Sequence, residues 1–153
     1  MKNVRVLVAF LIIVFGVAYL GGRFQPGEWY QVLKKPPFTP PGWLFAPVWT
    51  LLYILIAVSG WKAWVSARGT VRIVPFTCWF FQMALNALWS FLFFGLHRLD
   101  LALAGAILLW AAIFLTGCCF WRVNRLASLL LVPYLLWVSF ACVLTYSIYS
   151  LNR

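Results

Sequence analysis

The chain has 153 residues, of which 65% are hydrophobic and only 9% charged, and its formal net charge is +10. A soluble domain contains roughly 45–50% apolar and about 25% charged residues, so this composition excludes an ordinary water-soluble protein. A nucleic-acid-binding protein is excluded too, because the basic residues lie almost entirely at the ends of apolar segments, where lipid headgroups account for them. We expect one membrane domain over residues 1–153.

Five apolar segments are long enough to cross a bilayer, since a transmembrane helix needs ~20 mostly apolar residues. In lipid each segment must satisfy its own backbone hydrogen bonds, and continuous apolar runs without alternation exclude a β-barrel. The expected fold is therefore an all-α integral membrane protein, a bundle of five transmembrane helices. The very short connections at residues 96–98 and 122–125 make the last three helices antiparallel neighbours. The predicted helices are residues 4–20, 47–65, 75–95, 99–121 and 126–151.

The longest connection, residues 21–46, is rich in proline and aromatic side chains. Prolines fix φ and bias the preceding residue towards extended conformations, so this segment is semi-rigid rather than a flexible linker. Together with Trp29 and Tyr30, the prolines predict an ordered lid over one mouth of the bundle. The alternative is a structured loop with no role in ligand binding.

The basic residues divide unequally between the two sides of the predicted bundle. Seven lie on the side of the amino terminus and five on the other, which favours a cytoplasmic amino terminus by the positive-inside rule. The short basic amino terminus fits a bacterial cell membrane. The seven are Lys2, Arg5, Lys62, Arg68, Arg72, Arg122 and Arg125.

Ionisable side chains are missing from the middle of the predicted spans. Ion-coupled transporters and proton relays usually need such groups within the membrane. The two acidic residues, Glu28 and Asp100, lie at or outside the interface, so no carboxylate pair is available for acid–base catalysis. His97 is the single histidine and is interpreted as an interfacial polar residue rather than a metal or haem ligand. We expect no metal site and no conventional hydrolase.

Aromatic residues make up 20% of the chain, and several share a helix face with polar groups. Trp49 and Tyr53 are four residues apart and hence on one face, and Trp137 shares a face with Ala141. Burying the amides of Gln82 and Asn86 without partners costs several kcal/mol, so they face the bundle interior. There they either join helices through hydrogen bonds or line a cavity; the spacing leaves both open.

Four motifs in chain order resemble the translocator protein family, also called tryptophan-rich sensory proteins or TspO/MBR. They are W-Y-x-x-L-x-K-P-x-x-x-P-P-x-W from Trp29, P-V-W-T-x-L-Y from Pro47, Q-x-x-x-N-x-x-W-S-x-x-F-F-G from Gln82 and P-Y-x-x-W-x-x-F-A from Pro133. The resemblance implies a five-helix bundle, a homodimer by preference, that binds protoporphyrin IX or haem near the lid. In eukaryotic members it also implies binding of cholesterol and synthetic benzodiazepine-site drugs. The matching pocket positions are Tyr30, Pro40, Pro41, Trp49, Tyr53, Asn86, Trp89, Trp137 and Ala141.

The resemblance supports three hypotheses. The first is a receptor or carrier that stacks a tetrapyrrole on Trp49 and Trp137, orients it through Asn86 and Gln82, and serves porphyrin regulation or stress sensing without a required cofactor. The second is light-dependent degradation of protoporphyrin, in which the same two tryptophans would be catalytic. The third is transport of porphyrins or sterols, for which the family's cholesterol pattern can be read, as a weak match, at Leu144, Tyr149 and Arg153.

Overall fold

The structure is a computed structural model that describes residues 2–153, with side chains from residue 3 onward. Within these residues the chain is mostly helical and has no strands, which confirms the all-α fold class. Five stretches are long and apolar enough to cross a membrane, as the sequence predicts. They are Asn3–Gly22, Gly42–Ser66, Gly69–Gly95, Leu99–Trp121 and Arg125–Leu151.

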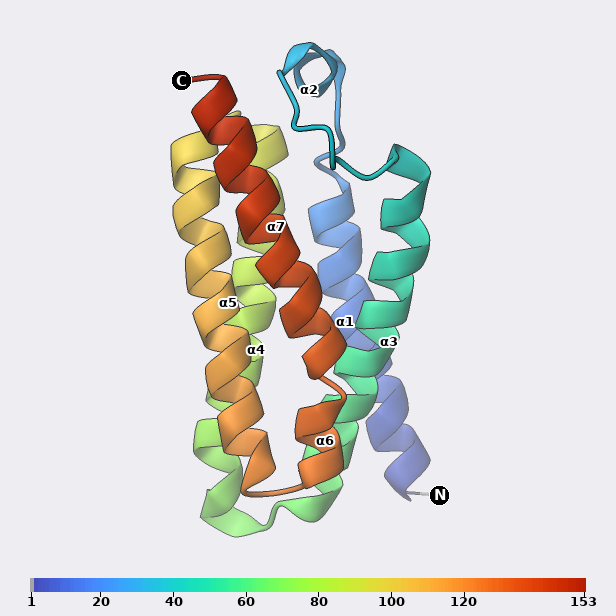
Figure 1. Cartoon of the computed structure of the whole chain (residues 1–153). Coiled ribbons are helices and arrows are strands. Elements are labelled where there is room, and N and C mark those ends of the chain that lie inside the picture. The colour runs from blue at the N-terminus through green and yellow to red at the C-terminus, as the bar shows by residue number, and fades with distance from the viewer. Residues whose placement is uncertain (1) are drawn as a thin grey trace.

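Some spans consist of more than one helical element, and a short helix lies outside them (Figure 1). The elements are α1 (Lys2–Gly22), α2 (Glu28–Val32), α3 (Gly42–Ser66), the 3₁₀ turn η1 (Gly69–Arg72), α4 (Ile73–Ser90), the π-helical turn η2 (Phe91–Gly95), α5 (Leu99–Trp121), α6 (Arg125–Leu129) and α7 (Val132–Leu151).

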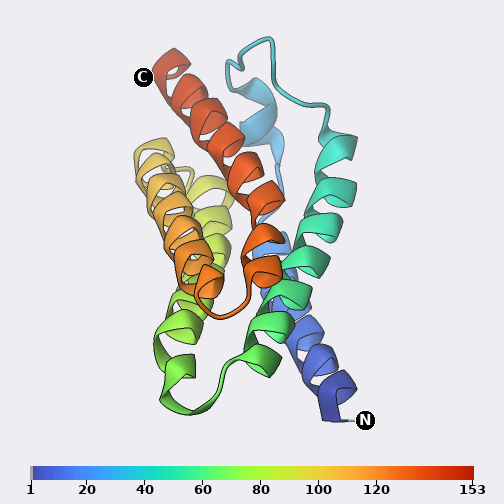
Figure 2. The same cartoon turned by 60° about the horizontal axis from the view of Figure 1, so that its bottom comes forward.

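The long helices form a closed ring in which α1 packs against α3 and α4, α4 against α5, and α5 against α6 and α7. The ring closes where α6 meets α3, whereas α7 contacts α3 only slightly. As Figure 2 shows, α7 and α3 diverge towards the end that carries α2 and the carboxyl terminus. The helices α3 and α7 are therefore further apart at the α2 end than α3 and α6 are at the other end.

Large apolar side chains cover the outside of the ring as well as its interior. Ile12 is 68% and Leu136 65% exposed, which is stable only because lipid takes the place of water around them. Inside, the ring of Phe10 meets that of Trp79 edge-on with centroids 5.1 Å apart. Gly60 on α3 makes room for this contact, and aromatic packing of this kind joins α1, α3 and α4 in the closed half of the bundle.

Three features of the helices differ substantially from the prediction, and the first is the start of α3. This helix begins at Gly42 rather than at Pro47. A proline near the beginning of a helix removes only one backbone hydrogen bond, and Leu44 already donates its N–H to the carbonyl of Pro41 at 3.0 Å. The aromatic side chain of Phe45 is thereby fixed on a helix instead of in a loop.

The second difference is the wide turn η2 at the end of the third span. Leu96 donates its N–H to the carbonyl of Phe91, five residues back, at 2.8 Å. The π turn adds one residue to the helical path. As a result both Phe93 and Phe94, adjacent in sequence, face the same cavity.

The third difference is a break in the last span between α6 and α7, at Leu130 and Leu131. Pro133 occupies the first turn of α7 and has no N–H to donate to the carbonyl of Leu129. The single helix predicted over residues 126–151 is therefore divided into α6 and α7. Asn124 caps α6 by accepting the N–H of Ala127 at 3.0 Å, which starts a separate short helix.

The lid is also more ordered than a loop, since it contains α2 and is tied down at two points. The ring of Trp29 stacks on that of His97, with centroids 4.2 Å apart and planes inclined by 17°. The side chain of Asn152 binds the backbone of Lys34 through two hydrogen bonds. The lid is thus attached both to the α4–α5 connection and to the end of α7.

Candidate functional site

A cavity of about 730 Å³ lies inside the bundle beneath the lid. Its walls come from α1, α3, α4, η2, α5 and α7, and its cover comes from lid residues that include Gln25, Tyr30 and Pro40. The volume is within the ~300–1,000 Å³ range of small-molecule sites. The divergence of α3 and α7 explains why the cavity is at this end.

Ten of the wall residues are aromatic. On α3 the rings of Trp49 and Tyr53 lie 5.3 Å apart between centroids. Phe45, also on α3, meets the ring of Trp137 on α7 edge-on, with centroids 5.9 Å apart. The ring of Trp89 lies 5.2 Å from that of Phe93. Offset and edge-on contacts of this kind fix ring orientations, so the cavity offers preformed flat surfaces to a ligand.

A polar relay crosses the cavity wall and joins three helices. Tyr53 of α3 donates its hydroxyl to Oδ1 of Asn86 on α4 at 3.1 Å. Asn86 in turn donates through Nδ2 to the hydroxyl of Tyr134 on α7 at 2.9 Å. Tyr53 and Asn86 line the cavity, whereas Tyr134 is fully buried behind it. Both alternatives for Asn86 therefore hold, because this amide joins helices and also borders a cavity.

The charge of the cavity is set by Lys35, the one ionised side chain among its described wall residues. Its Nζ donates to the carbonyl of Gln31 at 3.2 Å and of Leu33 at 3.3 Å, and it lies 4.6 Å from the centroid of the Tyr30 ring. Burial raises the pKa of the Tyr30 phenol, which remains neutral at physiological pH. The mouth of the cavity is therefore positive, and an anionic group is favoured there.

Most of the residues predicted for the pocket lie in this one cavity wall. They are Tyr30, Pro40, Trp49, Tyr53, Asn86, Trp89, Trp137 and Ala141. Pro41, which precedes the first residue of α3, is not in the wall. Of the weak sterol pattern, Leu144 lines the cavity, whereas Tyr149 and Arg153 lie outside its wall.

Gln82 is buried one turn further along α4 from Asn86, away from the lid, and does not line the cavity. Neither atom of its amide has a hydrogen-bond partner among the described residues. Nε1 of Trp89 likewise has no partner within residues 2–153, but Trp89 does line the cavity. The indole N–H of Trp89 is itself buried, so Trp89 borders the cavity without offering this donor to it.

Several wall residues were not found from the sequence. Phe93 and Phe94 reach the cavity because of the π turn, and Phe45 because α3 starts early. The F-F-G sequence at residues 93–95 was noted in a motif but not assigned to the pocket. Small residues of α1, such as Ala18 and Gly21, also form part of the wall, and helical periodicity alone did not distinguish them from lipid-facing positions.

Metal ligands are sparse around the cavity. The wall contains no His, Cys, Met, Asp or Glu among its described residues, and no cluster of three potential metal-ligating side chains occurs in residues 2–153. The phenols of Tyr30 and Tyr53 are the anionisable oxygens in the wall.

The fold and the site together define a multi-pass membrane protein whose helical bundle encloses an aromatic cavity beneath a proline-rich lid. The model of the TspO/MBR family matches residues 8–151, and the chain belongs to this family. It is 42% identical to the tryptophan-rich protein TspO of Archaeoglobus fulgidus, covering 98% of this chain and 99% of the relative. It is 41% identical to protein CrtK of Rhodobacter capsulatus, covering 86% and 83%. It is 34% identical to the human translocator protein, covering 88% and 83%.

Proposed function

We propose that this protein is a membrane receptor or carrier that binds protoporphyrin IX, or a similar flat apolar macrocycle with anionic substituents, in the cavity beneath the lid. The ring system stacks on Trp49 and Trp137, and its carboxylates point to the lid, where Lys35 lies. The observation that carries the proposal is the combination of preformed aromatic walls with one cation at the mouth. In such a site the carboxylate edge of a planar dianion lies at the cation, and its apolar faces pack against the aromatic walls.

The test is a titration of the detergent-solubilised full chain with protoporphyrin IX in the dark, followed by the porphyrin absorption band and tryptophan quenching. Trp137→Ala removes a wall ring and should weaken binding by about tenfold or more, because it removes both ring stacking and buried area. Trp43→Ala is the matched control, since Trp43 is 73% exposed and lies outside the wall. Equal affinities in the two variants would contradict the assignment of the cavity.

Light-dependent degradation of the bound porphyrin is a second candidate function, favoured by the three tryptophans in the wall, Trp49, Trp89 and Trp137. An excited porphyrin can exchange an electron with an indole at contact distance, with oxygen as the co-reactant. Illumination of the complex in air should then give a new absorption spectrum at a rate that falls in Trp49→Phe. Unchanged spectra after illumination would leave binding as the function.

A further inference from the structure

A second hollow lies on the outside of the bundle, at the end opposite the lid. It has a volume of about 340 Å³ and lies between α5 and the α6–α7 junction. We name it the α5–α7 groove; its walls are Ile113, Phe114, Gly117, Cys118, Trp121, Arg122, Ser128, Leu131, Val132 and Leu135. It shares no residue with the cavity beneath the lid.

The groove exists because the last span is broken. Leu131 lies in the break between α6 and α7. The outer surface of the last span is therefore interrupted at this point, opposite Gly117 of α5. Ser128 donates its hydroxyl to the carbonyl of Gly117 at 2.8 Å. This bond uses the hydroxyl of the groove's one serine and leaves the rest of the floor apolar.

The length of the groove matches one leaflet of a bilayer. Its wall on the α5 side runs from Ile113 to Arg122, nine helical steps or about 14 Å along a helix. Half of the hydrocarbon core of a bilayer is about 15 Å. The apolar part therefore lies at the depth of acyl chains, and Arg122 and Trp121 lie at the level of headgroups.

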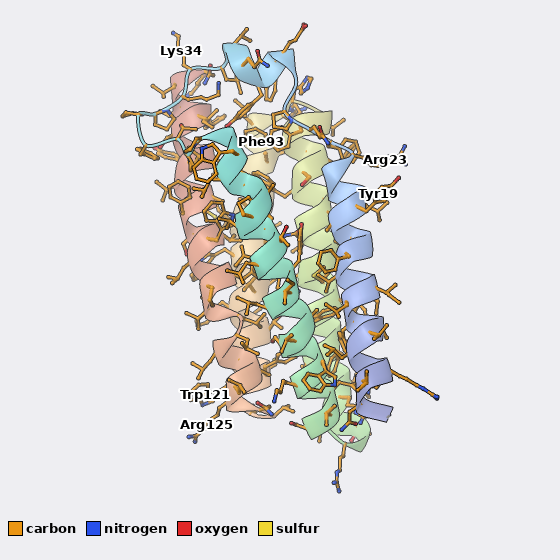
Figure 3. The ribbon with its side chains drawn as sticks, turned by 90° about the vertical axis from the view of Figure 1, so that its right-hand side faces the viewer. Tyr19, Arg23, Lys34, Phe93, Trp121 and Arg125 are labelled. Carbon is orange, nitrogen blue, oxygen red and sulfur yellow. The ribbon has the colours of Figure 1, made fainter. Side chains whose placement is uncertain are left out.

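The headgroup end of the groove is basic and has no acidic counterpart. Arg122 lines the groove, and the guanidinium carbon of Arg125 lies 5.3 Å from the ring centroid of Trp121, another wall residue. Figure 3 shows Trp121 and Arg125 together at the end of the bundle furthest from Lys34. Among the described residues the ion pair present joins Arg98 to Asp100 at the opposite end, so no carboxylate neutralises these arginines.

We infer that the α5–α7 groove is a binding site for an anionic phospholipid, with an acyl chain along the apolar floor and the phosphate at Arg122 and Arg125. Charge complementarity identifies the occupant. The start of α1 and the chain from the end of α3 through η1 lie at the same end as α6 (Figure 1), and these segments carry Arg5, Lys62, Arg68 and Arg72, so this end attracts anionic lipid. A free phosphate ion would use the arginines but not the apolar floor. The site is independent of the ligand proposed for the cavity beneath the lid.

The experiment is native mass spectrometry of the purified full chain in mild detergent, with palmitoyl-oleoyl phosphatidylglycerol or phosphatidylcholine added. We expect one phosphatidylglycerol to be retained preferentially, with an apparent Kd that rises about tenfold in Arg122→Gln/Arg125→Gln. The matched control is Arg23→Gln/Lys34→Gln, which removes two charges at the other end (Figure 3) and should leave retention unchanged. Equal retention of the two lipids, or equal loss in both variants, would overturn the inference.

The apolar half of the groove is tested separately. Cys118 is exposed and lines the groove, so Cys118→Phe should fill it and reduce phosphatidylglycerol retention by about the same factor without changing the charge. Leu108→Phe, at another exposed position of α5, should have no effect. Displacement of the lipid by inorganic phosphate at equal concentration, or full retention in Cys118→Phe, would show an ion site on the arginines and reject the phospholipid site.

Discussion

Asn152 and Lys34 are 118 residues apart in sequence and form a reciprocal pair of hydrogen bonds. Oδ1 of Asn152 accepts the backbone N–H of Lys34 at 3.0 Å, and Nδ2 of Asn152 donates to the carbonyl of Lys34 at 2.8 Å. The end of α7 thus holds the lid by its backbone, one residue from the Lys35 that borders the cavity. The side chain of Lys34 takes no part and points away from the bundle (Figure 3).

Removing this pair should loosen the lid without unfolding the bundle. In Asn152→Ala we expect hydrogen exchange of the peptide over residues 28–38 to accelerate by up to about tenfold, since each exposed hydrogen bond contributes on the order of 1 kcal/mol. Porphyrin dissociation should accelerate as well. The control is Ser147→Ala, which removes an exposed hydrogen bond within α7 that does not reach the lid. If hydrogen exchange over residues 28–38 were as fast in this control as in Asn152→Ala, the attachment of the lid by Asn152 would be rejected.

The charge of Lys35 should distinguish porphyrins by their carboxylates. In Lys35→Gln we expect the affinity for protoporphyrin IX to fall about tenfold, because the one cation of the cavity wall is lost. The affinity for the uncharged dimethyl ester should not change. Lys34→Gln is the matched control, since Lys34 does not line the cavity. An equal loss for acid and ester would indicate a structural defect instead of a charge effect.

The relay through Asn86 should contribute to stability as a unit. Asn86→Leu leaves the hydroxyls of Tyr53 and Tyr134 without this partner, and we expect the free energy of unfolding to fall by about 1–2 kcal/mol. Adding Tyr134→Phe should cost less in the Asn86→Leu background than in the parent chain. Unfolding in mixed micelles with increasing SDS gives the four free energies. Strict additivity would show that the two side chains act independently.

Two helical glycines provide an opposed pair of stability tests. At Gly60 an added Cβ would lie 2.7 Å from Cε1 of Phe10 and 3.1 Å from Cε2 of Trp79, so Gly60→Ala should destabilise the protein by about 1–3 kcal/mol through overpacking. At Gly16 an added Cβ meets nothing within 4 Å, and Gly16→Ala should be neutral or stabilise by up to about 1 kcal/mol. The same SDS denaturation measures both. Similar shifts in the two variants would contradict the packing at Gly60.

The five spans could be predicted because lipid imposes a strong constraint, namely a long apolar run for each crossing. The face shared by Trp49 and Tyr53 followed from helical spacing, and the inward position of Asn86 followed from the cost of placing its amide in lipid. Spacing could not tell that Gln82, one turn away, would lie behind the cavity wall, because that depends on how neighbouring helices diverge. The contact between Asn152 and Lys34 joins the carboxyl-terminal end of the chain to the lid through the backbone of Lys34, which no side-chain pattern reveals.

The π turn has a consequence for how variation in this protein can be interpreted. One residue of a helix corresponds to a rotation of about 100°, so deleting a single residue within 91–95 would restore regular α-helix and turn Phe93 and Phe94 relative to α4. The aromatic surface beneath the lid therefore depends on the number of residues in this segment as well as on their identity. A related chain with the same phenylalanines but one residue fewer would present a different cavity.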